Sequence, residues 1–314
     1  MMRIRTFAAA ATVLAGLAGC GDTGGTPAAA GNGDRLAVVA TTTQVADFAR
    51  AVGGDRVSVT QILKPNIDPH DYEPTAADVT AIGNAAVLVK NGIGLEGWLD
   101  ATVAAAGFKG TVADASTGVR LRDGSGDGEG EGEGERDPHI WHDPRNAKLM
   151  VATIERAFAA AAPADAAVFE RNLGSYTTRL DELDATIAAR IASLPPGNRK
   201  LVTNHDAFGY YIDRYGLQYV GAIIPSFDTS AELSAKDVDD IVAKIRRTGT
   251  TAVFSESSLP PKTAEAIGRQ AGVKVVAGED ALYGDTLGPE GSDGDTYLKM
   301  ETHNTDTIVR ALGG

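Results

Sequence analysis

The chain has a single cysteine, Cys20, among its 314 residues. No disulfide can therefore form within it, and no cluster of thiolates can bind a metal ion. Positive charge is also scarce, because 29 lysines and arginines stand against 42 aspartates and glutamates, a formal net charge of −13. This balance argues against nucleic acid as a partner and is compatible with a cationic ligand.

Only one long apolar run occurs, from Phe7 to Leu17, and it follows two arginines. It is shorter than the roughly 20 residues that span a bilayer, so residues 1–19 are predicted to be a signal peptide. Leu17-Ala18-Gly19-Cys20 resembles a bacterial lipobox. The resemblance implies cleavage before Cys20 and a lipid on its thiol; the alternative is an ordinary signal peptide with an incidental cysteine. Residues 20–34 then form a lipidated cysteine and a flexible tether, which places the protein extracytoplasmically, anchored to the cell membrane.

Strand-like and helix-like segments alternate along the rest of the chain. The strand patterns cover residues 36–40, 57–63, 86–90, 200–203, 218–224, 251–256 and 273–277, and the helix patterns cover 45–52, 76–82, 95–106, 208–215, a helix capped by Ser234 and Asp237, and 261–272. This alternation predicts an α/β fold with mainly parallel sheets flanked by helices. In such sheets ligands bind at the carboxyl ends of the strands.

The longest helix pattern lies between the two halves, at residues 163–195. Its apolar residues are spaced by three or four positions from Phe169 to Leu194, and prolines stand at both ends. We expect one long rigid helix that joins an N-terminal α/β lobe, residues 35–162, to a C-terminal α/β lobe, residues 196–314. An internal coiled coil is the alternative.

The segment 123–137 consists almost entirely of acidic residues and glycine. This composition predicts a disordered loop. It is either a solvated insertion or a loose loop that gathers cations near a site.

Four of the five histidines stand in three short polar strings. They are His70, the pair His139 and His142, and His205, with about 65 to 70 residues between strings. Neutral imidazole is the commonest protein ligand for metals. Zinc fingers and His-Glu-x-x-His helices take their ligands from one short stretch of chain. The histidines of this chain are far apart in sequence, so as ligands of one ion they would have to converge from several loops. The pattern therefore predicts a metal cleft between the two lobes.

Together the strings resemble those of a known family. They are Pro-His-Asp-Tyr-Glu-Pro at 69–74, Asp-Pro-His-Ile-Trp-His-Asp-Pro at 137–144, Val-Thr-Asn-His-Asp-Ala-Phe-Gly-Tyr-Tyr at 202–211 and Leu-Tyr-Gly-Asp-Thr-Leu-Gly at 282–288. The chain resembles the zinc- and manganese-binding solute-binding lipoproteins of bacterial ABC importers, an adhesin-like, two-lobed family. The resemblance implies metal ligands at His70, His139, His205 and Asp285, two from each lobe. It further implies a monomer without catalytic activity that delivers one divalent ion to an ABC permease and its ATPase.

Several residue assignments stay open at this stage. His142 is the alternative to His139 as a metal ligand. Glu256 is either a ligand or a residue that orients one. His303 is expected to have a structural role. Trp141 and Tyr72 are expected to pack between the lobes. Asp68, Asp71, Asp143 and Asp206 are the candidates for orienting the imidazoles.

Zinc is the expected metal. Manganese-binding relatives carry glutamate where this chain has His205, and imidazole-rich sites suit zinc better than manganese. A manganese or iron receptor of the same family is the alternative. A zinc hydrolase and a cell-surface adhesin are the other classes, although the chain has neither a His-Glu-x-x-His nor a Gly-x-Ser-x-Gly motif.

Overall fold

The computed structural model describes residues 35–123 and 136–313. The predicted signal peptide, Cys20, the tether and most of the predicted acidic loop lie outside the described residues. Residues Arg35–Gly314 form one compact unit. Within the described residues, no helix has the length and apolar content needed to cross a membrane.

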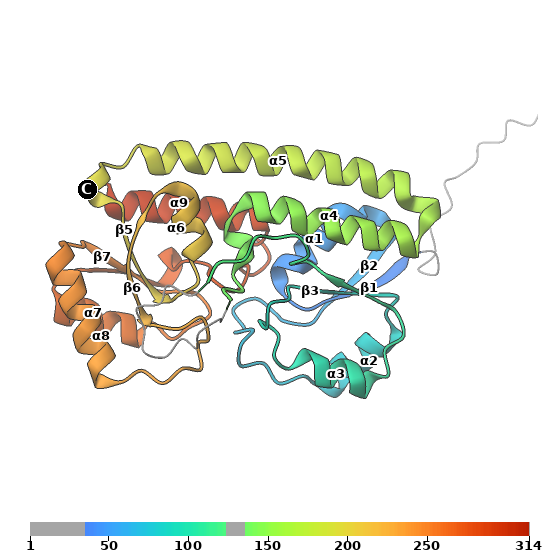
Figure 1. The fold of residues 1–314 in the computed structure, drawn as a ribbon, viewed down its shortest axis with the longest axis horizontal. Helices are drawn as coiled ribbons and strands as arrows, with labels where there is room; N and C mark the ends of the chain where they lie inside the picture. Colours follow the sequence, from blue (N-terminus) through green and yellow to red (C-terminus); the bar gives the residue numbers. More distant parts are fainter. Residues whose placement is uncertain (1–34, 124–135, 314) are drawn as a thin grey trace, which may run out of the picture. The chain divides into compact units, whose positions relative to one another are not determined.

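The N-terminal lobe is a four-stranded sheet with helices on both faces (Figure 1). Its strands are all parallel and lie in the order β2-β1-β3-β4. They are β1 Leu36–Ala40, β2 Val57–Gln61, β3 Val87–Lys90 and β4 Thr111–Asp114, and the helices are α1 Thr43–Gly53, α2 Ala76–Asn84, α3 Leu99–Ala106 and α4 Pro144–Ala161.

Alternation along the strands explains the two helix layers. Val38 and Val87 belong to one hydrophobic cluster with residues of α1 and α4, while Val39 and Leu88 belong to a second cluster with residues of α2 and α3. Successive side chains of a strand point to opposite faces, so a strand that is apolar throughout must be covered on both sides.

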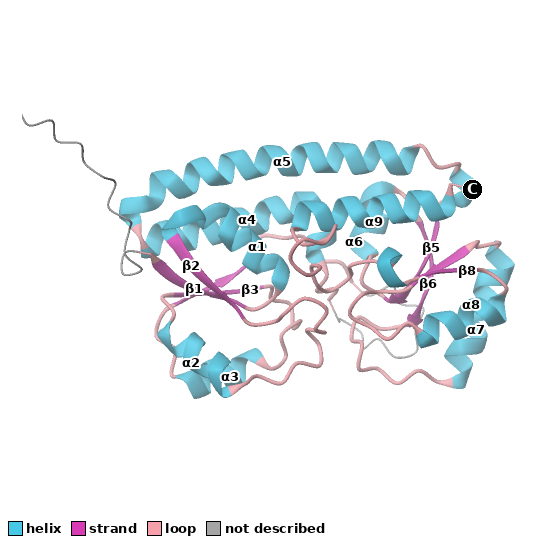
Figure 2. Ribbon diagram, turned by 180° about the vertical axis from the view of Figure 1, so that it is seen from behind, coloured by secondary structure: helices cyan, strands magenta, loops and turns pink. Residues whose placement is uncertain are grey.

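The C-terminal lobe repeats this plan with two parallel strand pairs, β5-β6 and β7-β8. Helices α7 and α8 pack on one side, and α6 and α9 lie on the other (Figures 1 and 2). The strands are β5 Lys200–His205, β6 Gln218–Ile224, β7 Ala252–Phe254 and β8 Lys274–Val276, and the helices are α6 Gly209–Tyr215, α7 Ala235–Thr248, α8 Lys262–Ala271 and α9 Tyr297–Leu312.

Helix α5, Ala166–Ala192, contacts α1 and α4 of the first lobe and α6 and α9 of the second (Figure 2). At about 1.5 Å per residue, its 27 residues span about 40 Å. Its buried face, which includes Phe169, Leu180 and Ile191, belongs to a single hydrophobic cluster that contains residues of both lobes. One continuous core therefore holds the two lobes against one stiff helix.

The predicted α/β fold with mainly parallel sheets and a long helix is confirmed, and several details differ. β4 and α4 were not predicted, although Asp143-Pro144 is a helix-start signal and the Asp143 carboxylate accepts a hydrogen bond from the Arg145 amide. Helix α3 begins four residues later than expected. Residues 95–98 instead continue an irregular loop that starts with Gly92, Ile93 and Gly94, whose φ angles are positive at 92°, 58° and 78°.

The exact boundaries of the domains stay predictions. One part of the acidic segment is corrected by the structure, because Asp137 is fully buried. Asp123 and Arg136 also pair as an antiparallel bridge. A buried carboxylate requires hydrogen-bonding partners, and those of Asp137 are described below.

Truncating a buried side chain of α5 tests whether this helix contributes to the hydrophobic core that both lobes share. Leu180 is fully buried, so we expect Leu180→Ala to lower the free energy of unfolding by about 3 kcal/mol. Leu149 of α4 is 43 % exposed, and we expect Leu149→Ala to cost less than about 1 kcal/mol. Urea unfolding followed by circular dichroism measures both. Equal effects of the two substitutions would show that α5 does not contribute to the core in this way.

Candidate metal site

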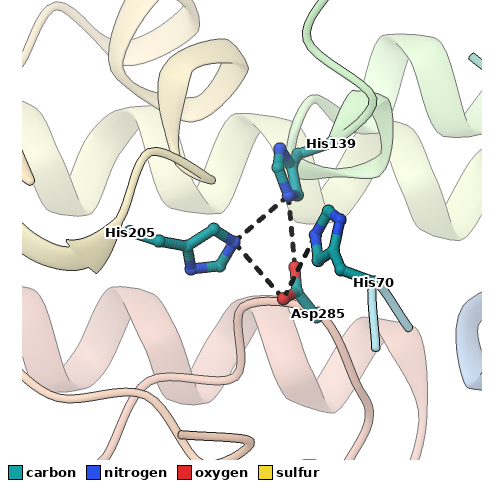
Figure 3. A group of neighbouring side chains, drawn as sticks. All are labelled: His70, His139, His205 and Asp285. Carbon is teal, nitrogen blue, oxygen red and sulfur yellow. Dashed lines mark hydrogen bonds and ion pairs between the residues drawn. The ribbon is translucent and has the colours of Figure 1, made fainter. Parts of the chain in front are cut away.

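Three imidazoles and one carboxylate converge from four separate segments (Figure 3). His70 lies in the loop after β2, and His139 directly precedes a 3-10 turn, Ile140–His142, that leads into α4. His205 is the last residue of β5, and Asp285 lies in the loop between β8 and α9. The parallel topology brings strand ends to one edge, as expected for ligand-binding sites in such sheets.

The loop that carries His70 is attached to the C-terminal lobe by two hydrogen bonds. The Asn66 amide donates to the Thr286 hydroxyl at 3.0 Å, and the Thr229 hydroxyl donates to the Asp68 carboxylate at 2.6 Å. The other carboxylate oxygen of Asp68 accepts from the His70 amide at 2.9 Å. Asp68 therefore fixes the backbone of His70 and joins it to the opposite lobe.

Several distances between the donor atoms are close to the edges of a tetrahedron around one ion. His139 Nε2 lies 3.2 Å from His205 Nε2 and 3.3 Å from Asp285 Oδ1. Asp285 Oδ2 lies 3.3 Å from His205 Nε2 and 3.7 Å from His70 Nε2. Ligands at about 2.0–2.2 Å from a tetrahedral ion lie about 3.3–3.6 Å apart, and these four distances are close to that spacing, while all the donor atoms lie within 4.8 Å of one another.

Hydrogen bonding within the protein leaves this cluster incomplete. Among the described residues, His70 Nε2 and both carboxylate oxygens of Asp285 are buried and have no hydrogen-bond partner. Buried polar atoms normally have a partner, because leaving one without costs about 1–3 kcal/mol. The Nε2 atoms of His139 and His205 also face one another. This arrangement needs a shared proton or a cation between their lone pairs. A divalent cation would satisfy all of these atoms at once.

Two further carboxylates orient the imidazoles. Asp137 Oδ1 accepts from the His139 amide at 3.0 Å and lies 2.9 Å from His139 Nδ1. Glu256 Oε1 accepts from the His205 amide at 3.0 Å, and Glu256 Oε2 lies 2.8 Å from His205 Nδ1. The Asp137 contact holds a proton on His139 Nδ1 and turns Nε2 toward the cluster, and Glu256 places a negative charge beside His205 Nδ1.

A glycine makes room for one of these carboxylates. A Cβ atom at Gly284 would overlap the carboxylate of Glu256. Gly284 precedes Asp285, so the missing side chain lets the loop of one ligand approach the carboxylate that orients another. Close approach of this kind is a common reason for glycine at a binding site.

The pKa values of the four groups follow from burial and from the carboxylates. Burial lowers the pKa of His70 to about 4. Burial alone would also lower the pKa of His139, but the nearby carboxylates of Asp137 and Asp285 outweigh it and raise that pKa to about 9. In His205, burial is likewise outweighed by the charges of Asp285 and Glu256, which raise its pKa well above the usual value. Burial would raise the pKa of Asp285, yet His205 and His139 hold it well below its usual range.

The other candidate residues lie outside the cluster. His142 Nδ1 lies 2.8 Å from Glu301 Oε1 and its Nε2 lies 3.1 Å from the Gly284 carbonyl, so neither nitrogen faces the other ligands. His303 Nε2 lies 3.0 Å from the Ala281 carbonyl, a structural contact. Trp141 reaches across to the C-terminal lobe, where its indole N–H donates to the Gly284 carbonyl at 3.2 Å.

Some expectations about neighbouring residues were wrong. Tyr72 packs within its own lobe, with its ring 5.2 Å from that of Trp98 and its hydroxyl donating to Asp78. Of the aspartates considered for orienting imidazoles, Asp68 accepts a hydrogen bond from the His70 amide and not from its ring. Asp143 caps α4, and Asp71 is exposed. Asp137, which orients His139, was assigned to the acidic loop, and its position two residues before His139 was the available signal.

Comparison with known proteins points to one family. The family model described as zinc-uptake complex component A, periplasmic (ZnuA) matches residues 38–311. The chain is 33% identical over 290 residues to the zinc-binding protein TroA of Treponema pallidum (strain Nichols), with 92% of each chain covered. It is 33% identical over 318 residues to the manganese-binding lipoprotein MntA of Bacillus subtilis (strain 168), covering 99% of this chain and 100% of the relative.

A solved structure shares the fold. The periplasmic zinc binding protein TroA from Treponema pallidum superimposes with a TM-score of 0.80 at 31% sequence identity, covering 89% of this chain and 100% of that one. This similarity agrees with the parallel sheets, the flanking helices and the long helix α5 described above.

Binding of a divalent cation should release protons. His139, with a pKa of about 9, and His205, with a pKa well above its usual value, hold protons at pH 7, whereas ligation requires a free lone pair. We therefore expect about one to two protons to be released per zinc ion near pH 7, and apparent affinity to weaken as the pH falls. Calorimetric titration in buffers of different ionisation enthalpy measures the release. A binding enthalpy that is the same in every buffer would contradict the prediction.

Proposed function

We propose that this chain, which belongs to the periplasmic zinc-uptake complex component A family, captures one zinc ion and delivers it to the permease of an ABC importer. Members of this family are metal-binding receptors and not enzymes, so the zinc hydrolase considered from the sequence is not supported. The chain is accordingly a periplasmic receptor for a metal ion, which is its cargo. The choice of zinc, the four ligands and the delivery step are the proposal.

The observation that carries the proposal is the convergence of His70, His139, His205 and Asp285. Their donor atoms lie within 4.8 Å of one another although they come from segments throughout the chain. Four protein donors nearly close a tetrahedral site, whereas catalytic zinc keeps an open position for water. The site is suited to holding an ion and leaves little room for chemistry on a substrate.

The donor set supports zinc over manganese. Three imidazoles and one carboxylate are typical of zinc, while manganese prefers carboxylates, carbonyls and water. In the divalent series manganese also lies at the weak end of the affinity order. The curated relatives include a zinc-binding and a manganese-binding protein, so the argument for zinc rests on the ligands of this chain.

The route of delivery follows from the predicted N-terminus. A lipid on Cys20 would tether the protein to the outer face of the cytoplasmic membrane, and residues 20–34 would give it reach. The ion-loaded monomer would then dock on the permease, and the ATPase would drive transport. Closure of the lobes is favoured only as far as the ion binds the closed form more tightly.

Competition between metals tests the proposed cargo. We expect residues 21–314, stripped of metal and offered zinc and a tenfold excess of manganese, to retain one zinc per chain, because zinc binds imidazole-rich sites more strongly than manganese does, by orders of magnitude. Native mass spectrometry reads the bound metal directly. Preferential manganese uptake would overturn the zinc assignment, and no retained metal would overturn the receptor function.

Removing one ligand tests the site. We expect His205→Ala to weaken zinc binding at least about a hundredfold, because it removes one of four ligands and leaves Glu256 without its partner. The matched control is His303→Ala, which removes a histidine that lies outside the cluster and should leave zinc affinity unchanged. Competition with a chromophoric chelator measures both. If both variants bind zinc as the wild type does, His205 is not a ligand.

A further inference from the structure

A chain of polar contacts runs outward from His139. Asp137 pairs with His139 through Oδ1, and its second oxygen, Oδ2, accepts a hydrogen bond from Arg122 Nη1 at 2.8 Å. The side chain of Asp137 is 0% exposed and that of Arg122 is 21% exposed. The guanidinium therefore contacts the carboxylate that lies against Nδ1 of the His139 ring.

Helix α6 of the C-terminal lobe holds this arrangement from the other side. Arg122 Nε donates to Asp213 at 2.7 Å. The Tyr210 hydroxyl accepts from the Arg122 amide at 3.0 Å and donates to the Asp137 carbonyl at 3.1 Å. Two residues of α6 thus fix both the side chain of Arg122 and the backbone next to His139.

Gly209, the first residue of α6, leaves the space that the guanidinium occupies. A Cβ atom at this position would overlap Arg122 Nη1 and come within 2.8 Å of Asp137 Oδ2. This is an observation independent of the hydrogen bonds, because it concerns shape. The start of α6 has room for the Arg122–Asp137 pair only because residue 209 has no side chain.

We propose that Arg122 is a positioning residue for metal capture, which sets the orientation of His139 through Asp137 and ties that ligand to α6. This inference rests on the proposed function, since it assigns a role in the same metal site. Arginine suits the task because its planar fork donates to two carboxylates at once from a fixed geometry. Lysine offers a point charge and does not impose the same alignment on Asp137 and Asp213.

The consequence concerns the choice of metal as well as affinity. Asp137 has two buried oxygens, and with Arg122 in place each has its own partner. Without the guanidinium, one oxygen loses its donor, and a carboxylate that rotates to regain one no longer holds the His139 ring in place. Zinc in a four-coordinate site depends on ring orientation, whereas manganese accepts water in place of a displaced ligand. Loss of Arg122 should therefore reduce zinc binding more than manganese binding.

Three substitutions test the assignment in the metal-free protein lacking residues 1–20. Arg122→Gln removes the charge and the fork, Arg122→Lys restores only the charge, and Gly209→Ala displaces the guanidinium while all charges remain. The matched control for the last is Gly174→Ala in α5, where a Cβ atom would meet nothing within 4 Å. The measurements are zinc and manganese dissociation constants by chelator competition, the visible absorption spectrum of bound cobalt(II), and thermal unfolding without metal.

We expect the zinc dissociation constant to rise about ten- to a hundredfold in Arg122→Gln and about tenfold in Gly209→Ala, with Arg122→Lys between the wild type and Arg122→Gln. The zinc-to-manganese affinity ratio should fall, and the cobalt spectrum should change because the geometry of the ligands changes. Gly174→Ala should bind zinc within about twofold of the wild type, since it lies far from any ligand contact.

The inference is overturned if Arg122→Gln and Gly209→Ala lower the melting temperature but leave the cobalt spectrum and the affinity ratio unchanged, because Arg122 would then only stabilise the fold. If Arg122→Gln does not fold, the cobalt spectrum and the zinc-to-manganese affinity ratio of Gly209→Ala test the role of Arg122. Failure of the wild type to bind zinc, manganese or cobalt would instead overturn the proposed function, so the two failures are distinguishable.

Discussion

The arrangement of the two lobes depends on the contacts between the buried carboxylate of Asp285 and three imidazoles. One of its oxygens faces His139, and the other faces His205 and His70. Among the described residues, neither oxygen has a hydrogen-bond partner. A carboxylate and three imidazoles packed this closely are stable only if protons or a cation balance them. Since the ligands come from both lobes, this balance depends on how the lobes are held.

The fold limits how far the position of the lobes can change. One hydrophobic cluster contains residues of α5, of the N-terminal sheet and of α9, so separating the lobes fully would expose part of the core. The contacts on the side of the His70 loop are different in kind. They are single hydrogen bonds, such as those from Asn66 to Thr286 and from Thr229 to Asp68, and each contributes only about 0.5–1.5 kcal/mol. Breaking these hydrogen bonds would therefore leave the core around α5 intact.

The sequence was sufficient for most of the strands and helices, although β4 and α4 were missed. It was also sufficient for the long helix and the four residues of the cluster, because each depends on local pattern or on a short string. It was not sufficient for the residues that orient the ligands. Glu256 lies 51 positions from His205, and the contact exists because β5 and β7 lie side by side and Gly284 has no side chain. His142 illustrates the same limit, since only the structure shows that Glu301 and the Gly284 carbonyl engage both of its ring nitrogens. Local propensity also failed before α3, where Glu96 turns back to accept hydrogen bonds from the amides of Asn91 and Gly92 and keeps that stretch out of the helix.

The donor set and the spacing of the ligands are the two arguments for zinc as the proposed cargo. Zinc lies above manganese in the affinity order, so a manganese receptor must include some geometric feature that penalises zinc. Such a feature would be a set of donors held too far apart for a tetrahedral ion, or a set of carboxylates and waters that favours six ligands. Here the nearest donor atoms are 3.2 to 3.7 Å apart, which is close to a tetrahedral edge, and only one of the four residues is a carboxylate. The donor set of the described residues therefore supports the proposed preference for zinc over manganese.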